Sequence, residues 1–364
     1  MVGSTATGVR RTRRALLGTS AALLALALAA CSSSSPEPVR TPPPVTQTPG
    51  IDDARVAPPE PVVPVVWPLT GVPTDAVAQR PAIAVKIENS HVARPQKGLE
   101  FADVVWETIV EFDVSRLVAV FQSQYPDEIG PIRSVRPMDP LIASPLKGLI
   151  AFSGGQPGIL QLVQGSSLQA ISHDAGADGL YRVSRRSAPH NVYGSLAKFA
   201  AQADANHAAP PPPQFQFAAQ AALASAAVAG APATTLSFHL SSQSDPTWTW
   251  DAASGTWLRS EGSTPATSES GARLSAVNVV AVTAGHPGTP YGAQNGAIVP
   301  TYELVGEGDA SVATGGKVVT GRWHKASQDD PLLLTAADGT PILLAPGNTW
   351  VELVPAGSGS LTVG

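Results

Sequence analysis

The amino-acid sequence predicts an α+β fold, in which an α/β-type layered N-terminal domain is followed by a mainly β C-terminal domain. Three observations support this prediction. Apolar runs of strand length alternate with helical stretches between residues 65 and 205, which is typical of a sheet covered by helices. Short apolar runs separated by turn residues fill residues 235–364. The 364 residues include 35 prolines and 33 glycines, which favours loops and strands over long helices.

The first 30 residues have the pattern of an export signal. Four arginines between residues 10 and 14 precede an apolar run over residues 15–30, which is shorter than the roughly 20 residues of a membrane-spanning helix. The run ends at Cys31, the single cysteine of the sequence, and resembles the lipobox of bacterial lipoproteins. We therefore expect a signal peptide over residues 1–30 and a lipid on Cys31, which anchors the protein at the extracytoplasmic face of the cell membrane. The Sec and twin-arginine export routes are both compatible with this leader.

Residues 31–64 are expected to form a tether after the acylated cysteine. Ten of the 33 residues from 32 to 64 are proline. Proline-rich segments favour an extended backbone of about 3.1 Å per residue and do not build a packed core. The tether is therefore expected to hold the folded part away from the membrane, within reach of the cell wall.

The predicted N-terminal domain, residues 65–205, contains a series of short elements in chain order. Apolar runs predict strands, and a longer apolar stretch with two acids is compatible with either a helix or a strand. A glycine pair separates the last strand from a helical stretch. In order, these are a strand at 81–87, the ambiguous stretch at 102–110, strands at 116–121 and 149–152, and a helix at 158–163.

A proline- and alanine-rich connector, residues 206–234, precedes the predicted β-rich domain at 235–364. Within the connector, the alanine-rich stretch 218–229 is compatible with a helix or a flexible insertion. Trp248, Trp250 and Trp257 are expected to pack in the core of the β domain rather than to stack on sugar rings. The expected strands lie at 236–240, 276–282, 298–305, 317–323 and 350–354, with a hairpin formed by 332–334 and 342–344.

Several sequence segments occur in a fixed order along the chain. They are residues 86–99, 102–107, 130–137, 154–157, 178–180, 186–193 and 346–355. Together they resemble the YerB-like lipoprotein family. The resemblance runs from about Trp67 to the C-terminus, with one departure at 111–116, where relatives often carry a glycine pair. It implies two conserved domains of unknown function and an address outside the membrane, but no established reaction.

Charge and cysteine content exclude several classes of function. The formal net charge is −5, and loss of the leader with its four arginines takes it to about −9. Such a charge argues against nucleic-acid binding, which needs a basic surface. A single cysteine excludes an internal disulfide framework. We expect no cofactor and no metal site, because the histidines lack companions at metal-ligand spacing.

An arginine-rich set of residues is the candidate site. Guanidinium groups bind phosphate and carboxylate groups in a forked geometry. Glycine backbone N–H groups before a helix are suited to the same anions. A nearby histidine and asparagine supply further polar groups, although they are equally compatible with a backbone turn. We expect one cleft that contains Arg133, Arg136, Arg185, Arg186, His190, Asn191, Gly154 and Gly155.

Three functions are compatible with this set, with acids such as Glu107 and Glu111 as possible partners of the arginines. The leading hypothesis is a module that binds an anionic cell-envelope component, such as a wall glycan, or a wall-synthesis protein. The second is an enzyme that acts on phosphorylated glycan or lipid-linked wall intermediates, as a phosphotransferase or hydrolase. In the third, the arginines only form internal ion pairs.

Overall fold

Strands dominate the fold, as the spacing of apolar residues predicts. The structure, a computed structural model, describes residues 64–293 and 296–364, which belong to one compact unit. The predicted signal peptide, Cys31 and the tether up to residue 63 lie outside the described residues. No helix in the described part of the chain has the length and apolar character needed to cross a membrane.

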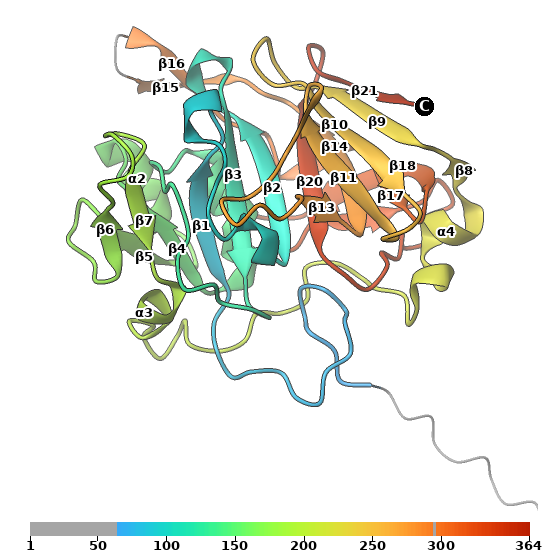
Figure 1. The fold of residues 1–364 in the computed structure, drawn as a ribbon, viewed down its shortest axis with the longest axis horizontal. Coiled ribbons are helices and arrows are strands. Elements are labelled where there is room, and N and C mark those ends of the chain that lie inside the picture. Colours follow the sequence, from blue (N-terminus) through green and yellow to red (C-terminus); the bar gives the residue numbers. More distant parts are fainter. Residues whose placement is uncertain (1–63, 294–295) are drawn as a thin grey trace, which may run out of the picture. The chain divides into compact units, whose positions relative to one another are not determined.

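An 11-stranded mixed sheet forms the centre of the fold (Figure 1). It is continuous across the predicted connector, because β2 pairs in parallel with β20. From one edge to the other its strands are β19 (Leu333–Thr335), β18 (Lys317–Lys325), β17 (Gly306–Thr314), β14 (Asn278–Ala284), β20 (Thr349–Pro355), β2 (Val104–Ile109), β3 (Ser115–Phe121), β1 (Ile83–Glu88), β4 (Leu149–Phe152) and β5 (Gln169–Ser172), and β8 (Ala231–Pro232) pairs with β18.

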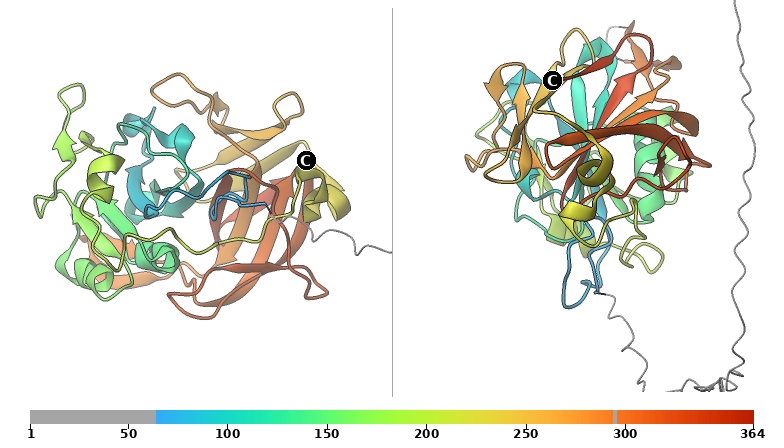
Figure 2. Two further views of the ribbon diagram at one scale, coloured as in Figure 1. Left: turned by 90° about the horizontal axis from the view of Figure 1, so that it is seen from below. Right: turned by 90° about the vertical axis from the view of Figure 1, so that its right-hand side faces the viewer.

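A second sheet of six strands packs across one face of the main sheet (Figure 1). Its strands all follow the connector. They are β12 (Thr264–Pro265), β11 (Thr256–Glu261), β10 (Pro246–Asp251), β9 (Thr235–His239) and β21 (Ser360–Val363), with β13 (Ser275–Ala276) paired to β11. The C-terminal strand β21 lies beside β9, which places the chain end at this sheet (Figure 2). Two separate ribbons complete the strands, β6 (Leu180–Arg182) with β7 (Val192–Gly194), and β15 (Gly288–Gly292) with β16 (Ile298–Pro300).

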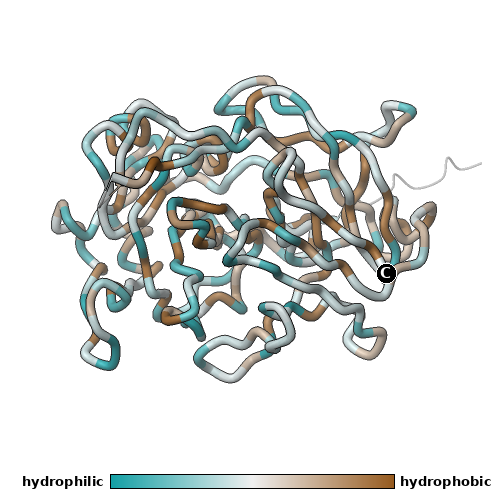
Figure 3. The backbone as a smooth tube through the Cα atoms, turned by 90° about the horizontal axis from the view of Figure 1, so that it is seen from above, coloured by the Kyte–Doolittle hydropathy of each residue, from teal (hydrophilic) through white to brown (hydrophobic). Residues whose placement is uncertain are grey.

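Both faces of the main sheet are covered, and this explains why its inner strands are apolar on both sides. Side chains alternate along a strand, so Ala84 of β1 packs in one core while Val85 packs in the other. The first core includes residues of α1 (Met138–Ala143) and α2 (Pro157–Gln164), and the second includes the inner face of the second sheet and α3 (Leu196–Ala200). Figure 3 shows the apolar stretches along the inner strands and polar stretches in many of the loops.

The predicted α+β class is confirmed, although helices cover less of the N-terminal region than expected. The helices are short, since α1 has six residues and α2 has eight. Gly165 ends α2, and Pro145 lies in the 3-10 turn η4 (Ser144–Leu146) that follows α1. The other 3-10 turns are η1 (His91–Ala93), η2 (Leu99–Phe101), η3 (Glu111–Asp113) and η5 (Ala221–Leu223).

Two predicted elements of the second half differ in detail from the structure. The alanine-rich stretch forms only η5 and the five-residue helix α4 (Ser225–Ala229). The predicted hairpin at 332–344 is reduced to β19 and a single bridge between Thr335 and Pro341. Pro341 has no N–H group to continue the ladder. Trp248 and Trp257 are fully buried, as expected for core packing.

Candidate functional site

Six strands of the main sheet point in the same direction, so their carboxyl ends meet at one edge. The parallel pairs are β1 with β4, β4 with β5, β2 with β20, and β14 with β20, and β3 pairs antiparallel with both β1 and β2. In open sheets of this kind, ligands bind outside the carboxyl ends of the parallel strands, where neighbouring strands diverge. We call this the carboxyl edge of the main sheet.

The arginine segment lies at the carboxyl edge, between the diverging ends of β1 and β4. The two strands pair only as far as Val85 and Ala151. Beyond that point the N–H of Arg133 donates to the carbonyl of Lys86 at 2.8 Å, and the carbonyl of Arg133 accepts from the N–H of Ser153 at 3.0 Å. The N–H of the next-but-one residue, Val135, donates to Gly154 at 3.0 Å. These bonds fix the segment that carries Arg133 and Arg136 beside the glycine pair.

Arg136 is buried in an ion pair. Its Nε donates to Glu111 Oε2 at 2.7 Å, and its terminal nitrogen bonds Glu111 Oε1. Arg116 of β3 shares this carboxylate at 3.3 Å. Burial alone would raise the pKa of Glu111, but Arg136 and Arg116 outweigh it and hold the pKa at about 2. Burial and the adjacent Arg136 lower the pKa of Arg116 to about 9, so two guanidinium groups compete for one carboxylate.

Arg133 is partly exposed and is less well paired than Arg136. Its side chain is 22% exposed, and its Nε lies 3.4 Å from Glu88 Oε2. That Nε is shielded from solvent and has no hydrogen-bond partner among the described residues. Glu88 also contacts His190, whose Nδ1 lies 2.9 Å from both carboxylate oxygens, and accepts from Ser90 Oγ at 2.8 Å. The structure therefore brings Arg133 and His190 together on one shared carboxylate.

Arg185 and Arg186 converge on a different carboxylate, that of Glu269. Arg185 lies 3.5 Å from it and 2.6 Å from Glu128, and its guanidinium stacks over the Tyr193 ring. Arg186 lies 3.3 Å from Glu269 and donates to the carbonyl of Pro95 at 2.6 Å. Both arginines thus tie the loop between β6 and β7 to the loop after β12. Their guanidinium groups contact neither Glu88 nor Glu111.

Asn191 and the glycine pair do not contact the same groups. Asn191 bonds residues of the β6–β7 loop, and the glycine pair lies in the loop after β4. Asn191 Oδ1 accepts from Arg182 at 2.7 Å, and its amide donates to Val183, so it stabilises the β6–β7 loop. The N–H groups of Gly154 and Gly155 have no acceptor among the described residues. A side chain at position 154 would clash with Asp174, whose carboxylate packs against that backbone. The glycines permit this close approach.

Lys86 lies next to the buried arginines. Its ammonium donates to Asp139 at 2.7 Å and to Thr108 Oγ1 at 3.1 Å, and both charged side chains are fully buried. Asp139 also accepts from the N–H of Arg136 at 2.6 Å. Burial lowers the pKa of Lys86 to about 8 despite the adjacent carboxylate. The pair is electrically balanced and anchors the start of α1.

Glu107 does not pair with any of the arginines that the sequence singled out. It lies on the opposite face of β2, where Arg259 of β11 reaches it at 2.6 Å. Arg259 also bonds Glu352 of β20 at 2.7 Å and Glu261 at 3.0 Å. Glu107 and Glu352 are direct neighbours across the β2–β20 pair. Arg259 therefore stabilises two adjacent carboxyl groups that would otherwise repel each other.

Arg259 and the carboxyl groups that it contacts shift one another's pKa values in different directions. Burial opposes the charge on Arg259, but Glu107, Glu261 and Glu352 outweigh it and raise its pKa. Burial and the negative charge of Glu107 raise the pKa of Glu352 well above the ordinary value, while Arg259 holds the pKa of Glu107 low despite its burial. Of the two neighbouring carboxyl groups, Glu352 is therefore the one that binds a proton more readily.

Arg259 was missed in the sequence, although a signal was present. Trp257 and Arg259 are two residues apart, so both project from the same face of β11. Trp257 was expected in the core, and the alternation of side chains places Arg259 in the core with it. Both residues are at most 1% exposed. A buried arginine requires carboxylate partners, and two of those of Arg259, Glu107 and Glu352, lie 152 and 93 residues away in the sequence.

Family comparisons agree with this fold. Residues 69–209 match the model described as "Protein of unknown function (DUF3048) N-terminal domain", and residues 235–351 match the corresponding C-terminal domain. The chain belongs to the YerB-like family. The resemblance noted in the sequence is thereby confirmed, including its two domains of unknown function.

The sequence comparison and the structure comparison both match a protein named YerB from Bacillus subtilis. A protein named "Putative lipoprotein YerB" is 35% identical over 130 residues, which cover 35% of this chain and 39% of the relative's own length. The match thus spans about two fifths of that curated relative. The crystal structure of YerB protein from the same organism has a TM-score of 0.69 at 24% identity, and covers 82% of this chain and 99% of the other. That similarity shows a shared fold.

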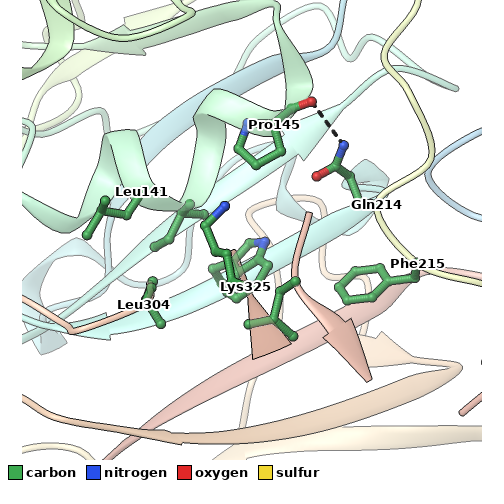
Figure 4. A pocket seen from close by; sticks show the side chains of 9 residues that line it. Leu141, Pro145, Gln214, Phe215, Leu304 and Lys325 are labelled. Carbon is green, nitrogen blue, oxygen red and sulfur yellow. Dashed lines mark hydrogen bonds between the residues drawn. The ribbon is translucent and has the colours of Figure 1, made fainter. Parts of the chain in front are cut away.

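A small apolar pocket in the first core of this YerB-like protein contains a single charged group (Figure 4). Lys325 lies there among side chains that include Leu141, Leu304 and Phe215. Its ammonium donates to the carbonyl of Gln328 at 2.9 Å and also to that of Asp330, and burial lowers its pKa to about 8. The cavity of about 10 Å³ holds at most one water molecule. Lys325 therefore anchors the loop before β19 and has no room for a substrate.

Acidic and histidine side chains do not gather into a metal site in the part of the chain that the structure describes. No group of three such residues with suitable spacing occurs there. The carboxylates nearest to the arginine segment, Glu88 and Glu111, are each already in contact with cationic or imidazole groups. The arrangement at the carboxyl edge is therefore suited to binding an anion.

Proposed function

We propose that this YerB-like protein is a membrane-anchored extracytoplasmic lipoprotein that binds an anionic cell-envelope component at the carboxyl edge, through Arg133. The anion is a phosphate or carboxylate group, carried by a wall glycan or by a wall-synthesis protein. The leader that ends at Cys31 and the name of the Bacillus subtilis relative support the address. The positive charges of the arginine segment support the anionic nature of the ligand.

An excess of positive charge is the observation that carries the proposal. Three guanidinium groups lie within electrostatic range of one another, and among the described residues two carboxylates form ion pairs with them. Lys86 and Asp139 cancel each other and leave this excess unchanged. In a partly buried site an unneutralised charge is costly, so an incoming anion is stabilised there more than at the surface. The three arginines are Arg116, Arg133 and Arg136, and the two carboxylates are Glu88 and Glu111.

Arg133 is the member of the cluster that a ligand can reach. The side chains of Arg116 and Arg136 are at most 10% exposed, whereas the Arg133 side chain is 22% exposed. Its Nη1 makes a long hydrogen bond of 3.4 Å to the carbonyl of Pro189, and its Nη2 has no hydrogen-bond partner among the described residues. These terminal nitrogens, and not the shielded Nε, therefore retain donors for an anion, and the two arginines behind them add their field.

Replacement of Arg133 by Gln is expected to weaken phosphate binding roughly 10- to 100-fold, the equivalent of about 1.5–3 kcal/mol for a charge-assisted hydrogen bond. The measurement is calorimetric titration of the full chain with inorganic phosphate. Arg322→Gln is the matched control, because Arg322 is 47% exposed and pairs with Glu307 and Asp309 on another part of the sheet. Equal phosphate affinity in both variants, or no binding by the unmodified protein, contradicts the proposed site.

Replacement of Cys31 by Ala is expected to move the protein from the membrane fraction to the soluble extracytoplasmic fraction. Acylation of this thiol supplies the anchor, and the substitution removes the atom that carries the lipid. The measurement is immunoblotting of separated membrane and soluble fractions. Ser32→Ala, at the adjacent position, is the control and is expected to stay with the membrane. Undiminished membrane retention of the Cys31→Ala protein would show that another feature holds it there.

A further inference from the structure

A polar cleft lies on the opposite face of the main sheet from Arg133. Glu88 and Asn89 are adjacent at the end of β1, so their side chains point to opposite faces: Glu88 contacts Arg133, and Asn89 contacts Glu107. On the Asn89 side, two adjoining hollows of about 280 Å³ and 360 Å³ share the lining residues His91, Arg94 and Glu261. Together they form a cleft between the loop after β1 and the β11–β12 hairpin.

The cleft has a polar part and a more apolar part. The first hollow is lined by groups that both donate and accept hydrogen bonds, and by Asp245. The second is bounded by Pro95, Pro265 and Ala266, with threonine side chains beside them. The rigid proline rings offer C–H surfaces that do not compete for hydrogen bonds. Hydrogen-bonding residues of the first hollow include Asn89, Ser90, Ser115 and Gln243.

Hydrogen bonds to buried side chains hold the central Arg94–Glu261 pair in place. Arg94 Nε donates to Asn89 Oδ1 at 3.2 Å, and one of its terminal nitrogens lies 3.0 Å from Glu261 Oε2. Asn89 is itself fixed by Gln96 at 2.8 Å, and Glu261 accepts from Arg259 at 3.0 Å. Such preorganisation lowers the entropic cost of binding. The other terminal nitrogen of Arg94 has no bonded partner among the described residues, and Arg94 lines both hollows, so it retains donors for a ligand.

The charges around the cleft disfavour an anion. Arg94 and Arg259 are balanced by Glu261 and Glu107, and the exposed Asp245 adds a negative charge. This is the reverse of the excess of positive charge around Arg133. A neutral ligand with many hydroxyl groups matches the cleft better, because each hydroxyl donates one hydrogen bond and accepts others.

We infer that this cleft is a saccharide-binding subsite, which takes neutral sugar residues of a glycan. Arg94 and Gln243 donate to sugar oxygens, Glu261 and Asp245 accept from sugar hydroxyls, and the C–H face of a ring packs on Pro95 and Pro265. A pocket of this size accommodates a short oligosaccharide and not a folded partner. The subsite consists of different residues from the anion site. An experiment can therefore contradict one proposal and leave the other unaffected.

The test fills the cleft with a large side chain at an exposed lining position. Thr264→Trp on β12 is expected to weaken binding of a neutral oligosaccharide at least tenfold, measured by titration calorimetry on the full chain with chitotetraose and, separately, maltotetraose. Thr249→Trp is the matched control, because Thr249 is exposed on β10 of the same sheet and does not line the cleft. The control is expected to bind as the unmodified protein does.

A second variant keeps the inference testable if Thr264→Trp does not fold. Gln243→Ala removes an exposed amide that lines the first hollow and is expected to weaken oligosaccharide binding about three- to tenfold. Phosphate affinity should be unchanged in both cleft variants, while Arg133→Gln should retain oligosaccharide affinity. Absence of saturable binding for both oligosaccharides, or equal affinity in Gln243→Ala and the unmodified protein, overturns the inference.

Discussion

Replacement of Arg259 by Met is expected to lower the free energy of unfolding by about 3–5 kcal/mol, the usual cost of leaving one partner of a buried ion pair without the other. Arg259 is 1% exposed and bonds Glu107 and Glu352, both fully buried. It also lies over the rings of Trp248 and Trp350. Methionine keeps the apolar stem but leaves Glu107 charged, with no cation to balance it. Urea unfolding followed by tryptophan fluorescence measures the loss.

Two controls separate this effect from a general loss of charge. Arg322→Met removes an exposed arginine with two exposed acidic partners and is expected to cost less than about 1 kcal/mol. Glu352→Gln keeps the shape of the carboxyl group whose pKa is raised and leaves the Arg259–Glu107 pair intact, so a similarly small change is expected. An Arg259→Met protein as stable as either control would mean that Glu107 becomes protonated with little penalty.

Local patterns in the sequence were sufficient to predict many of the strands. β1 and β3 are buried along their whole length, and such strands read as continuous apolar runs. The pairing of β2 with β20 joins Val105 to Trp350, and no local pattern encodes a contact between residues so far apart. The continuity of the sheet across the proline- and alanine-rich connector therefore could not be read from the sequence.

The candidate site was predictable in its position and not in its pairing. Arg133 and Arg136 lie beside Gly154 because a Pro-bounded segment runs between two strand ends, a geometry that the glycines and prolines indicate. The acids that pair with these arginines were not predicted from the sequence. The predicted strand ended at residue 87, and neither Glu88 nor Glu269 was singled out as a partner. Which acid meets which arginine depends on tertiary packing, and the composition of a segment carries no information about it.

Arg136 is expected to stabilise the fold and not to contact a ligand directly. From the sequence, Arg136 and Arg133 were equivalent candidates for a ligand. In the structure Arg136 is buried and bonded to Glu111 through two nitrogens, which makes it a structural element that also contributes positive charge to the site. Arg133 has the exposed and incompletely bonded guanidinium. A loss of stability is therefore the expected result of breaking the Arg136 pair.

A substitution of Glu111 tests whether breaking the Arg136 ion pair lowers the stability of the fold. Glu111→Gln leaves Arg116 and Arg136 buried without a carboxylate, and the free energy of unfolding at neutral pH should fall by about 3 kcal/mol or more. Glu307→Gln is the matched control. Its side chain is 68% exposed and pairs with Arg322, so a change below about 1 kcal/mol is expected.

The effect of Glu111→Gln should also depend on pH, in a direction set by the low pKa of Glu111. The carboxylate has a pKa of about 2 in the folded protein, against the ordinary value of 4.5. Its contribution to stability is therefore fully present above about pH 4.5 and is lost as the pH falls toward 2, because the folded protein must then take up a proton that the unfolded chain already holds. Glutamine resembles the protonated acid, so the stabilities of the unmodified protein and the variant should converge in acid. Urea unfolding at a series of pH values from 7 to 3 measures this convergence. A constant difference across that range would show that Glu111 stabilises the fold by its shape and hydrogen bonds and not by its charge.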